Sequence, residues 1–171
     1  MPRKKATPLS RPPELMDSPV VRLQINGGNS EERYDFNFEL SREGLLRCRM
    51  SDRMMRRQVP ETMSKVESRR VETLLRTLDP ARIKQIQAKL ARGKPKPIPP
   101  CSLIGKLEIW DGREFVQTIF MADPGQAEQA GHRIPAEVQA SLQAIFSMAA
   151  SATGLEGPAA LQPDQQMNGG K

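Results

Sequence analysis

The chain has 171 residues and a net charge of +6; 37% of its residues are hydrophobic and 4% are aromatic. This length suits one domain, and the low apolar content predicts a core that is smaller than the whole chain. No run approaches the roughly 18 apolar residues of a membrane-spanning helix, and no apolar signal segment follows the charged start. We therefore expect a cytoplasmic protein without a membrane partner.

Charge is distributed unevenly between the two halves of the chain. Residues 1–100 hold 22 Lys/Arg and 12 Asp/Glu, whereas residues 101–171 hold 4 and 8. A basic half attracts nucleic acid or acidic proteins, and it is also typical of a solvated basic face. Prolines and basic residues predict a disordered N-terminal arm over residues 1–18, and a composition rich in Gly, Pro and Gln predicts a disordered tail over residues 151–171.

Reactive side chains are sparse. Cys48 and Cys101 lack the spacing of a disulfide framework or a zinc site, and Cys48 lies in an alternating apolar pattern that is typical of a buried residue. The one histidine, His132, has no second metal-ligand pattern beside it, and the chain contains no Walker lysine and no dinucleotide-binding fingerprint. An enzyme needs a nucleophile with a base, an acid and base pair or a metal. We therefore predict no enzymatic activity, no metal and no cofactor.

Alternating side chains predict three strands near the start of the domain. Residues 20–25, 33–40 and 46–50 alternate between apolar and polar side chains, with turn-forming residues between them. An antiparallel meander of such strands has one buried face and one face that can stay in water. The three aromatic residues of segment 33–40 share a face with Leu40, so we interpret them as core and not as a platform for stacking bases.

The densest positive patch follows the third predicted strand. Segment 51–58 has the sequence Ser-Asp-Arg-Met-Met-Arg-Arg-Gln and is interpreted as a basic loop. Guanidinium groups in such a patch can bind phosphates or carboxylates, and a solvated loop gives the same pattern. The candidate residues of this patch are Arg47, Arg49, Arg53, Arg56 and Arg57.

Helical periodicity predicts three helices. Pro60 suits a first helical turn, and the step Asp79–Pro80 ends the first helix because a residue before proline avoids the helical conformation. Residues 93–100 form a proline-rich connector, and residues 123–133 are predicted as a loop. The predicted helices are Glu61–Leu78, Ala81–Ala91 and Pro135–Ala149.

The stretch from Leu103 to Met121 gives the clearest hairpin signal. Asp111–Gly112 lies between two β-rich runs and predicts a two-residue type I′ turn. With this loop, Leu107 opposes Val116 and Leu103 opposes Phe120. The other face then carries Trp110, Phe115, Ile119 and Met121.

Two residues beside the predicted turn are candidates for contact with a partner. Trp110 is either an interface hot spot or a cap on the edge of the core, and both interpretations stay open. Arg113 lies in the same turn and is the second candidate. The sequence defines no oligomeric state.

A resemblance to a known family gives a sharper hypothesis. An early strand ends in Ile25-Asn26-Gly27-Gly28, and the final helix has the pattern of Pro135, Val138 and Leu142. With the order of strands and helices, these features resemble the emfourin-type small bacterial inhibitors of thermolysin-like metalloproteases, over about residues 20–150. The resemblance implies a related fold and an inhibitor function. The basic segment, the second helix and the proline-rich connector are additional to that plan.

Taken together, the patterns predict a single α+β domain over residues 19–150. It has an antiparallel sheet of about five strands, and helices pack on one face of the sheet. The predicted function is non-catalytic binding of a protein partner, and protease inhibition is the sharpest version of it. The alternative is a nucleic-acid-binding accessory protein that uses the basic arm and the patch from Arg47 to Arg57.

Overall fold

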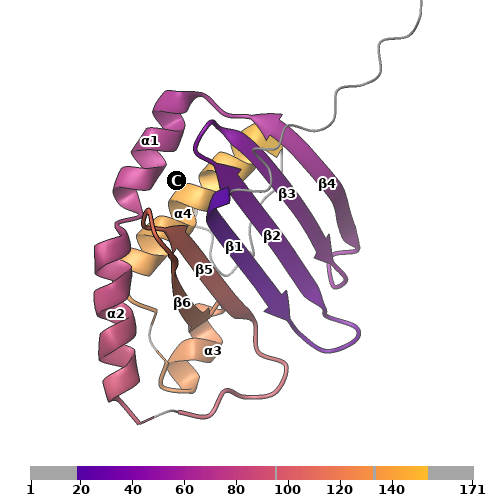
Figure 1. Cartoon of the computed structure of the whole chain (residues 1–171). Coiled ribbons are helices and arrows are strands. Elements are labelled where there is room, and N and C mark those ends of the chain that lie inside the picture. Colours follow the sequence, from indigo (N-terminus) through magenta and orange to yellow (C-terminus); the bar gives the residue numbers. More distant parts are fainter. Residues whose placement is uncertain (1–18, 95, 133, 154–171) are drawn as a thin grey trace, which may run out of the picture.

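The computed structural model describes residues 19–94, 96–132 and 134–153, and these form one α+β unit (Figure 1). The predicted N-terminal arm, residues 1–18, lies outside the described residues. So do residues 154–171 of the predicted tail. The strands are β1 (Pro19–Gly27), β2 (Tyr34–Ser41), β3 (Leu45–Asp52), β4 (Arg57–Lys65), β5 (Ile104–Trp110) and β6 (Phe115–Met121). The helices are α1 (Ser68–Thr77), α2 (Pro80–Arg92), α3 (Pro124–Gln129) and α4 (Ala136–Thr153).

All six strands belong to one antiparallel sheet with the order β4-β3-β2-β1-β5-β6. The predicted α+β class is confirmed, with one strand more than the expected five. Helix α4 lies behind the sheet in Figure 1, and α1 and α2 flank the side on which β6 lies. One face of the sheet is therefore covered by helices, and we call the opposite face the outer face.

Alternation along the strands builds the core. In β1, for example, Leu23 pairs with Phe38 of β2 and with Leu107 of β5, and all three side chains are buried on the helix-covered face. The rings of Phe36 on β2 and Phe146 on α4 meet edge to face, with 5.3 Å between their centroids. This aromatic contact joins the sheet to its longest helix. The helices add Val71, Leu74, Val138, Leu142 and Ile145 to the same core.

The predicted helix Glu61–Leu78 is wrong in its first half. Residues Arg57–Lys65 form the edge strand β4, and helix α1 spans only Ser68–Thr77. Pro60 lies within β4 and does not start a helix. The strand register shifts between the pairs Cys48–Thr62 and Met50–Val59, which places Pro60 in a bulge of β4. A proline, which has no N–H to donate, is tolerated at such a bulge in an edge strand.

The other helical predictions need smaller corrections. Helix α2 covers the predicted segment Ala81–Ala91. Helix α4 begins at Ala136, one residue after the predicted start, and continues to Thr153, so residues 151–153 of the predicted disordered tail are helical. The predicted loop over residues 123–133 contains helix α3, which sequence periodicity missed because it has only six residues. Asp123 caps this helix, since its Oδ1 accepts hydrogen bonds from the backbone N–H groups of Gly125 and Gln126.

The β5–β6 hairpin has a different register from the predicted one. The central residues of the turn are Gly112 and Arg113, and the N–H of Asp111 donates to the carbonyl of Glu114 at 3.0 Å. Gly112 has φ +104°, a positive value that glycine adopts readily because it has no β-carbon. Consequently Leu107 opposes Thr118, and Phe120 opposes Gly105; the predicted pairs Leu107–Val116 and Leu103–Phe120 are wrong.

The predicted division of side chains between the two faces of this hairpin nevertheless holds. The register pairs Trp110 with Phe115 and Lys106 with Ile119, on the face opposite to that of the buried pair Ile109–Val116.

Among the described residues, no helix is long and apolar enough to cross a membrane.

Candidate protein-binding surface

The outer face of the sheet carries an ion-pair network that includes one of the predicted basic residues. The guanidinium of Arg47 on β3 hydrogen-bonds the carboxylate of Glu39 on β2 and lies 3.6 Å from a carboxylate oxygen of Glu61 on β4. Arg22 on β1 lies 3.6 Å from the other oxygen of Glu39. The charge of Arg47 is therefore largely compensated within the sheet.

The remaining arginines of the predicted patch lie toward one end of the sheet. Segment 51–58 is not a free loop: it comprises the end of β3, a tight turn and the start of β4. Arg53 is fixed in this turn, because its guanidinium donates to the carbonyl of Ser30 at 2.7 Å. Two methionines beside it are strongly exposed, Met54 at 64% and Met55 at 68%. We call the exposed segment Arg53–Arg57 the arginine tip; Arg49 is exposed on the adjoining part of β3.

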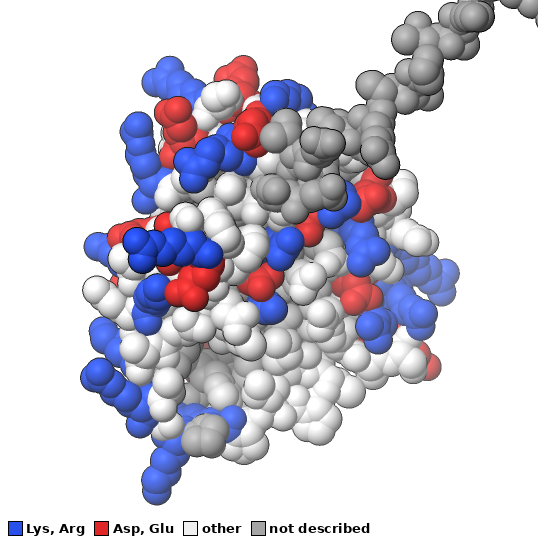
Figure 2. Space-filling model, in the orientation of Figure 1, with Lys and Arg blue, Asp and Glu red and all other residues white. Residues whose placement is uncertain are grey.

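Figure 2 shows how positive side chains are distributed on this side of the molecule. One group of Lys and Arg side chains lies along the helical flank formed by α1 and α2, and another lies over the β3–β4 side of the sheet. The structure therefore divides the predicted patch: Arg47 lies in the ion-pair network, whereas Arg53, Arg56 and Arg57 lie at the arginine tip.

Trp110 is half-buried on the outer face, at the end of β5. Its ring meets Phe115 of β6 edge to face, with 5.2 Å between the ring centroids. The guanidinium carbon of Arg22 lies 4.6 Å from the centroid of the Phe115 ring, a cation–π contact. This cluster leaves part of an aromatic surface in water beside the open face of the sheet. Arg113, the second predicted contact residue, is exposed in the adjacent turn.

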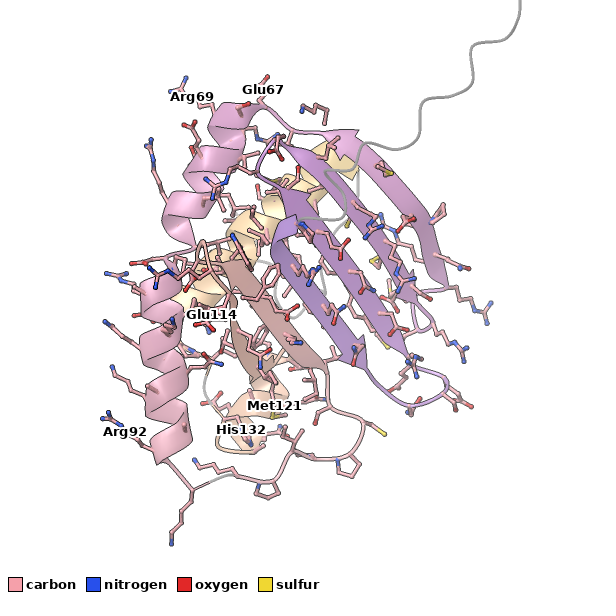
Figure 3. The ribbon with its side chains drawn as sticks, viewed as in Figure 1. Glu67, Arg69, Arg92, Glu114, Met121 and His132 are labelled. Atoms are coloured by element: carbon pink, nitrogen blue, oxygen red, sulfur yellow. The ribbon has the colours of Figure 1, made fainter. Side chains whose placement is uncertain are left out.

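The turn beside Trp110 is tied to helix α2 by charge. Oδ1 of Asp111 accepts hydrogen bonds from the N–H groups of Arg113 and Glu114, at 2.8 and 2.9 Å. The ammonium of Lys84 on α2 lies 3.0 Å from a carboxylate oxygen of Glu114 and 3.4 Å from one of Asp111. Figure 3 shows Glu114 next to α2.

These contacts shift the pKa values of both partners. The backbone N–H groups of Glu114 and Arg113, and then Lys84, hold the pKa of Asp111 below its usual range. Hydrogen bonds to Glu114 and Asp111 raise the pKa of Lys84. Because the pKa of Asp111 is lowered by folding, its stabilising contribution is present above the usual pKa of a carboxyl group. It is lost as the pH falls through the lowered pKa.

Substitution of Asp111 should separate its two roles. Alanine removes both the hydrogen-bond acceptor and the charge, whereas asparagine keeps an acceptor at Oδ1 and removes the charge. We expect the amide protons of Arg113 and Glu114 to exchange fastest in Asp111→Ala, more slowly in Asp111→Asn and most slowly in the unmodified protein. Amide hydrogen exchange followed by NMR at neutral pH measures this order. Equal exchange in all three proteins would show that the turn does not depend on Asp111.

A groove lies beside β6, where helix α2 ends. It has a volume of about 380 Å³ and a floor formed by apolar side chains of β6 and its surroundings. In Figure 3, Met121 and His132 lie close together at this lower end of β6. We call this feature the β6 groove. Its lining residues are Lys89, Gly93, Lys94, Lys96, Ile98, Thr118, Ile119, Phe120, Met121, Gly131, His132, Ile134 and Pro135.

The walls of the groove are fixed to one another. The ammonium of Lys96 donates to the carbonyl of Gly131 at 2.7 Å, and Nε2 of His132 lies 3.3 Å from the carbonyl oxygen of Pro97. The proline-rich connector is thus attached to the loop between α3 and α4. Figure 2 shows the surface hollowed between the lower half of α2 and the sheet. Sequence reasoning missed this groove because its residues come from three separate segments of the chain, 89–98, 118–121 and 131–135.

Neither cysteine adds an obvious reactive site. Cys48 is fully buried in the core, and burial raises the pKa of its thiol to about 12, as expected for a structural residue. Cys101 is exposed. Within residues 19–94, 96–132 and 134–153, no group of three or more His, Cys, Asp and Glu side chains could hold a metal ion.

No protein-family model matches this chain, and no curated protein shows significant similarity to it.

Proposed function

We propose that the chain is a non-catalytic protein-binding module. Its contact surface is the outer face of the β5–β6 hairpin together with the adjoining β6 groove. The observation that carries this proposal is Ile119: its side chain is 52% exposed on an edge strand, on the same face as the Trp110–Phe115 pair and in the lining of the groove. Large exposed apolar side chains beside half-buried aromatic ones are typical of interaction surfaces.

Variants on the two edges of the sheet test this proposal. The immobilised protein would be used to capture partners from a lysate of its source organism, at low and high salt. We expect Trp110→Ala and Ile119→Asp each to lower the captured amount of a specific partner at least tenfold, because truncating a hot spot costs about 2 kcal/mol or more. Met63→Asp is the matched control, since Met63 is 46% exposed on the opposite edge strand. Failure to capture any partner, or equal losses in all three variants, would reject this surface.

The sharper form of the proposal is inhibition of a thermolysin-like metalloprotease. It rests on the resemblance of Ile25–Gly28 and of the final helix to emfourin-type inhibitors. In the structure Ile25 is a buried core residue of β1, and Val138 and Leu142 are buried residues of α4, so these positions support a fold and not a contact. Hydrolysis of a peptide substrate by thermolysin, measured with increasing amounts of the protein, tests this form. Unchanged hydrolysis at a large molar excess would restrict the proposal to other partners.

The arginine tip favours a second candidate, binding of nucleic acid. Arg53, Arg56 and Arg57 lie together at the β3–β4 turn, and exposed guanidinium groups bind phosphates. This candidate predicts an affinity for single-stranded DNA that falls steeply with salt and decreases in Arg56→Ser/Arg57→Ser. The protein-binding surface predicts capture that depends on Trp110 and is unchanged in Arg56→Ser/Arg57→Ser. The two candidates therefore differ in the variant that weakens binding.

A further inference from the structure

The pattern of hydrogen bonds in the β5–β6 ladder determines which backbone groups of β6 face outward. The N–H of Ala122 donates to Leu103, and the N–H of Asp111 donates to Glu114, so these register pairs are hydrogen-bonded. Hydrogen-bonded and non-hydrogen-bonded pairs alternate along an antiparallel ladder. The pair Lys106–Ile119 is therefore a non-hydrogen-bonded one, and the N–H and C=O of Ile119 point away from β5.

This outward edge borders the β6 groove. Ile119 belongs to the groove lining, and outside the strand ladders no backbone–backbone hydrogen bond among the described residues involves its N–H or C=O. An edge strand with free backbone groups can pair with an extended segment of another chain. Helix α2 packs beside β6 and ends at Arg92. The groove begins at this end of the helix, since Lys89, Gly93 and Lys94 belong to its lining.

The charge of the groove defines what kind of segment it suits. Three lysines, Lys89, Lys94 and Lys96, line it together with His132, and its lining contains no Asp or Glu. Its apolar side chains include Ile98, which is 51% exposed, as well as Ile119. The groove thus combines an apolar floor with a positive rim.

We propose that the β6 groove binds an extended segment of a partner protein in which acidic and apolar residues alternate. In a strand, successive side chains point to opposite sides, so apolar residues contact the floor while carboxylates face the lysines. The backbone of the segment pairs with the N–H and C=O of Ile119. This inference rests on the proposed protein-binding function and specifies the class of partner.

The first test uses a defined probe, the peptide Asp-Val-Glu-Ile-Asp-Val-amide with carboxyfluorescein attached to its N-terminal amine. We expect saturable binding to the full chain by fluorescence polarisation, and at least tenfold weaker binding to Lys89→Glu/Lys94→Glu. Lys96 is left unchanged, because its ammonium also attaches the connector to Gly131. The matched control is Arg69→Glu/Arg82→Glu, which changes the net charge equally at exposed positions of α1 and α2 outside the groove. Binding that is absent at millimolar peptide, or equally weakened by both double variants, would overturn the proposal.

A second measurement tests the backbone pairing without altering the protein. In an extended peptide, the backbone N–H groups of alternate residues point to the same side. N-methylation of alternate residues therefore removes the hydrogen-bond donors from one edge of the peptide. We expect one of the two alternate N-methylation patterns to abolish binding and the other to preserve it, because only one edge of a strand faces β6. Equal binding of both methylated peptides would overturn strand pairing.

The same variants distinguish failure of this inference from failure of the proposed function. If a specific partner is captured in a Trp110-dependent manner but Lys89→Glu/Lys94→Glu captures it normally, the groove proposal is wrong and the protein-binding function stands. If no partner is captured, the function itself is rejected.

Discussion

Replacement of Phe36 by alanine should lower the free energy of unfolding by about 3–5 kcal/mol, the usual cost of removing a buried phenylalanine ring. Phe36 is completely buried in the centre of the sheet, and its ring contacts Phe146 of α4 edge to face at 5.3 Å. The substitution removes the side chain that joins the sheet to its longest helix and leaves a cavity that the neighbouring strands cannot fill. Urea denaturation followed by circular dichroism measures the loss.

Phe115→Ala is the matched control for this prediction. Phe115 is also an aromatic residue on a strand with an aromatic partner, but it is only half-buried and lies on the outer face. We expect a clearly smaller loss of stability, because water already reaches part of this ring. Comparable losses for the two variants would show that the outer face is covered by some other part of the protein in solution.

Substitution of Gly44 by alanine should destabilise the protein by about 3 kcal/mol, through backbone strain combined with a steric clash. Gly44 ends the turn between β2 and β3 with φ +89°, and a β-carbon there would lie 2.2 Å from the carbonyl oxygen of Val66. The carbonyl of Gly44 also accepts a hydrogen bond from the N–H of Val66 at 2.7 Å. The new methyl group would force these two segments apart, and thermal unfolding measures the effect.

Gly112 separates strain from steric clash. It has a similarly positive φ of +104°, but a β-carbon there would meet no atom within 4 Å. We expect Gly112→Ala to cost about 1 kcal/mol, the cost of a left-handed conformation alone. If both variants lost the same stability, contact between Gly44 and Val66 would not explain the effect.

The central strands could be predicted from sequence because one physical rule determines them. Apolar residues alternate cleanly in segments 20–25 and 33–40, and only one register places them all against the helices. Cys48 was predicted to be buried for the same reason, and it is. Proline positions and apolar stripes predict helices over Ala81–Ala91 and Pro135–Ala149, and the structure has helices over Pro80–Arg92 and Ala136–Thr153.

The errors arose where tertiary pairing overrides a local signal. Pro60 is typical of a helix start, but it lies in a bulge of an edge strand, and only the pairing of β4 with β3 determines this. Similarly, Asp111–Gly112 has the composition of a type I′ turn. The carboxylate of Asp111 instead binds the N–H groups of Arg113 and Glu114, which moves the turn by one residue.

The candidate surface was predicted only in part. Trp110 and Arg113 are candidates as single residues beside a turn, and the structure places Trp110 half-buried on the outer face and Arg113 exposed in the turn. The β6 groove depends on the approach of α2, the connector and the α3–α4 loop to one strand edge. Spacing along the chain contains no signal for such an approach. Only the folded structure shows that the exposed side chain of Ile119 lies in the same groove as Lys89, Lys94 and Lys96.

The position of β1 in the sheet has a consequence for how the protein folds. On one side β1 pairs with β2, its neighbour in sequence, and on the other side Val21 pairs with Ile109 from the second half of the chain. The β1–β4 meander can therefore form from local contacts, whereas closure by β5 must bring distant segments together, which is slower. Until β5 arrives, the apolar strand β1 is itself an exposed edge. Aggregation of this protein should therefore start from chains in which the second half is still unfolded or not yet synthesised.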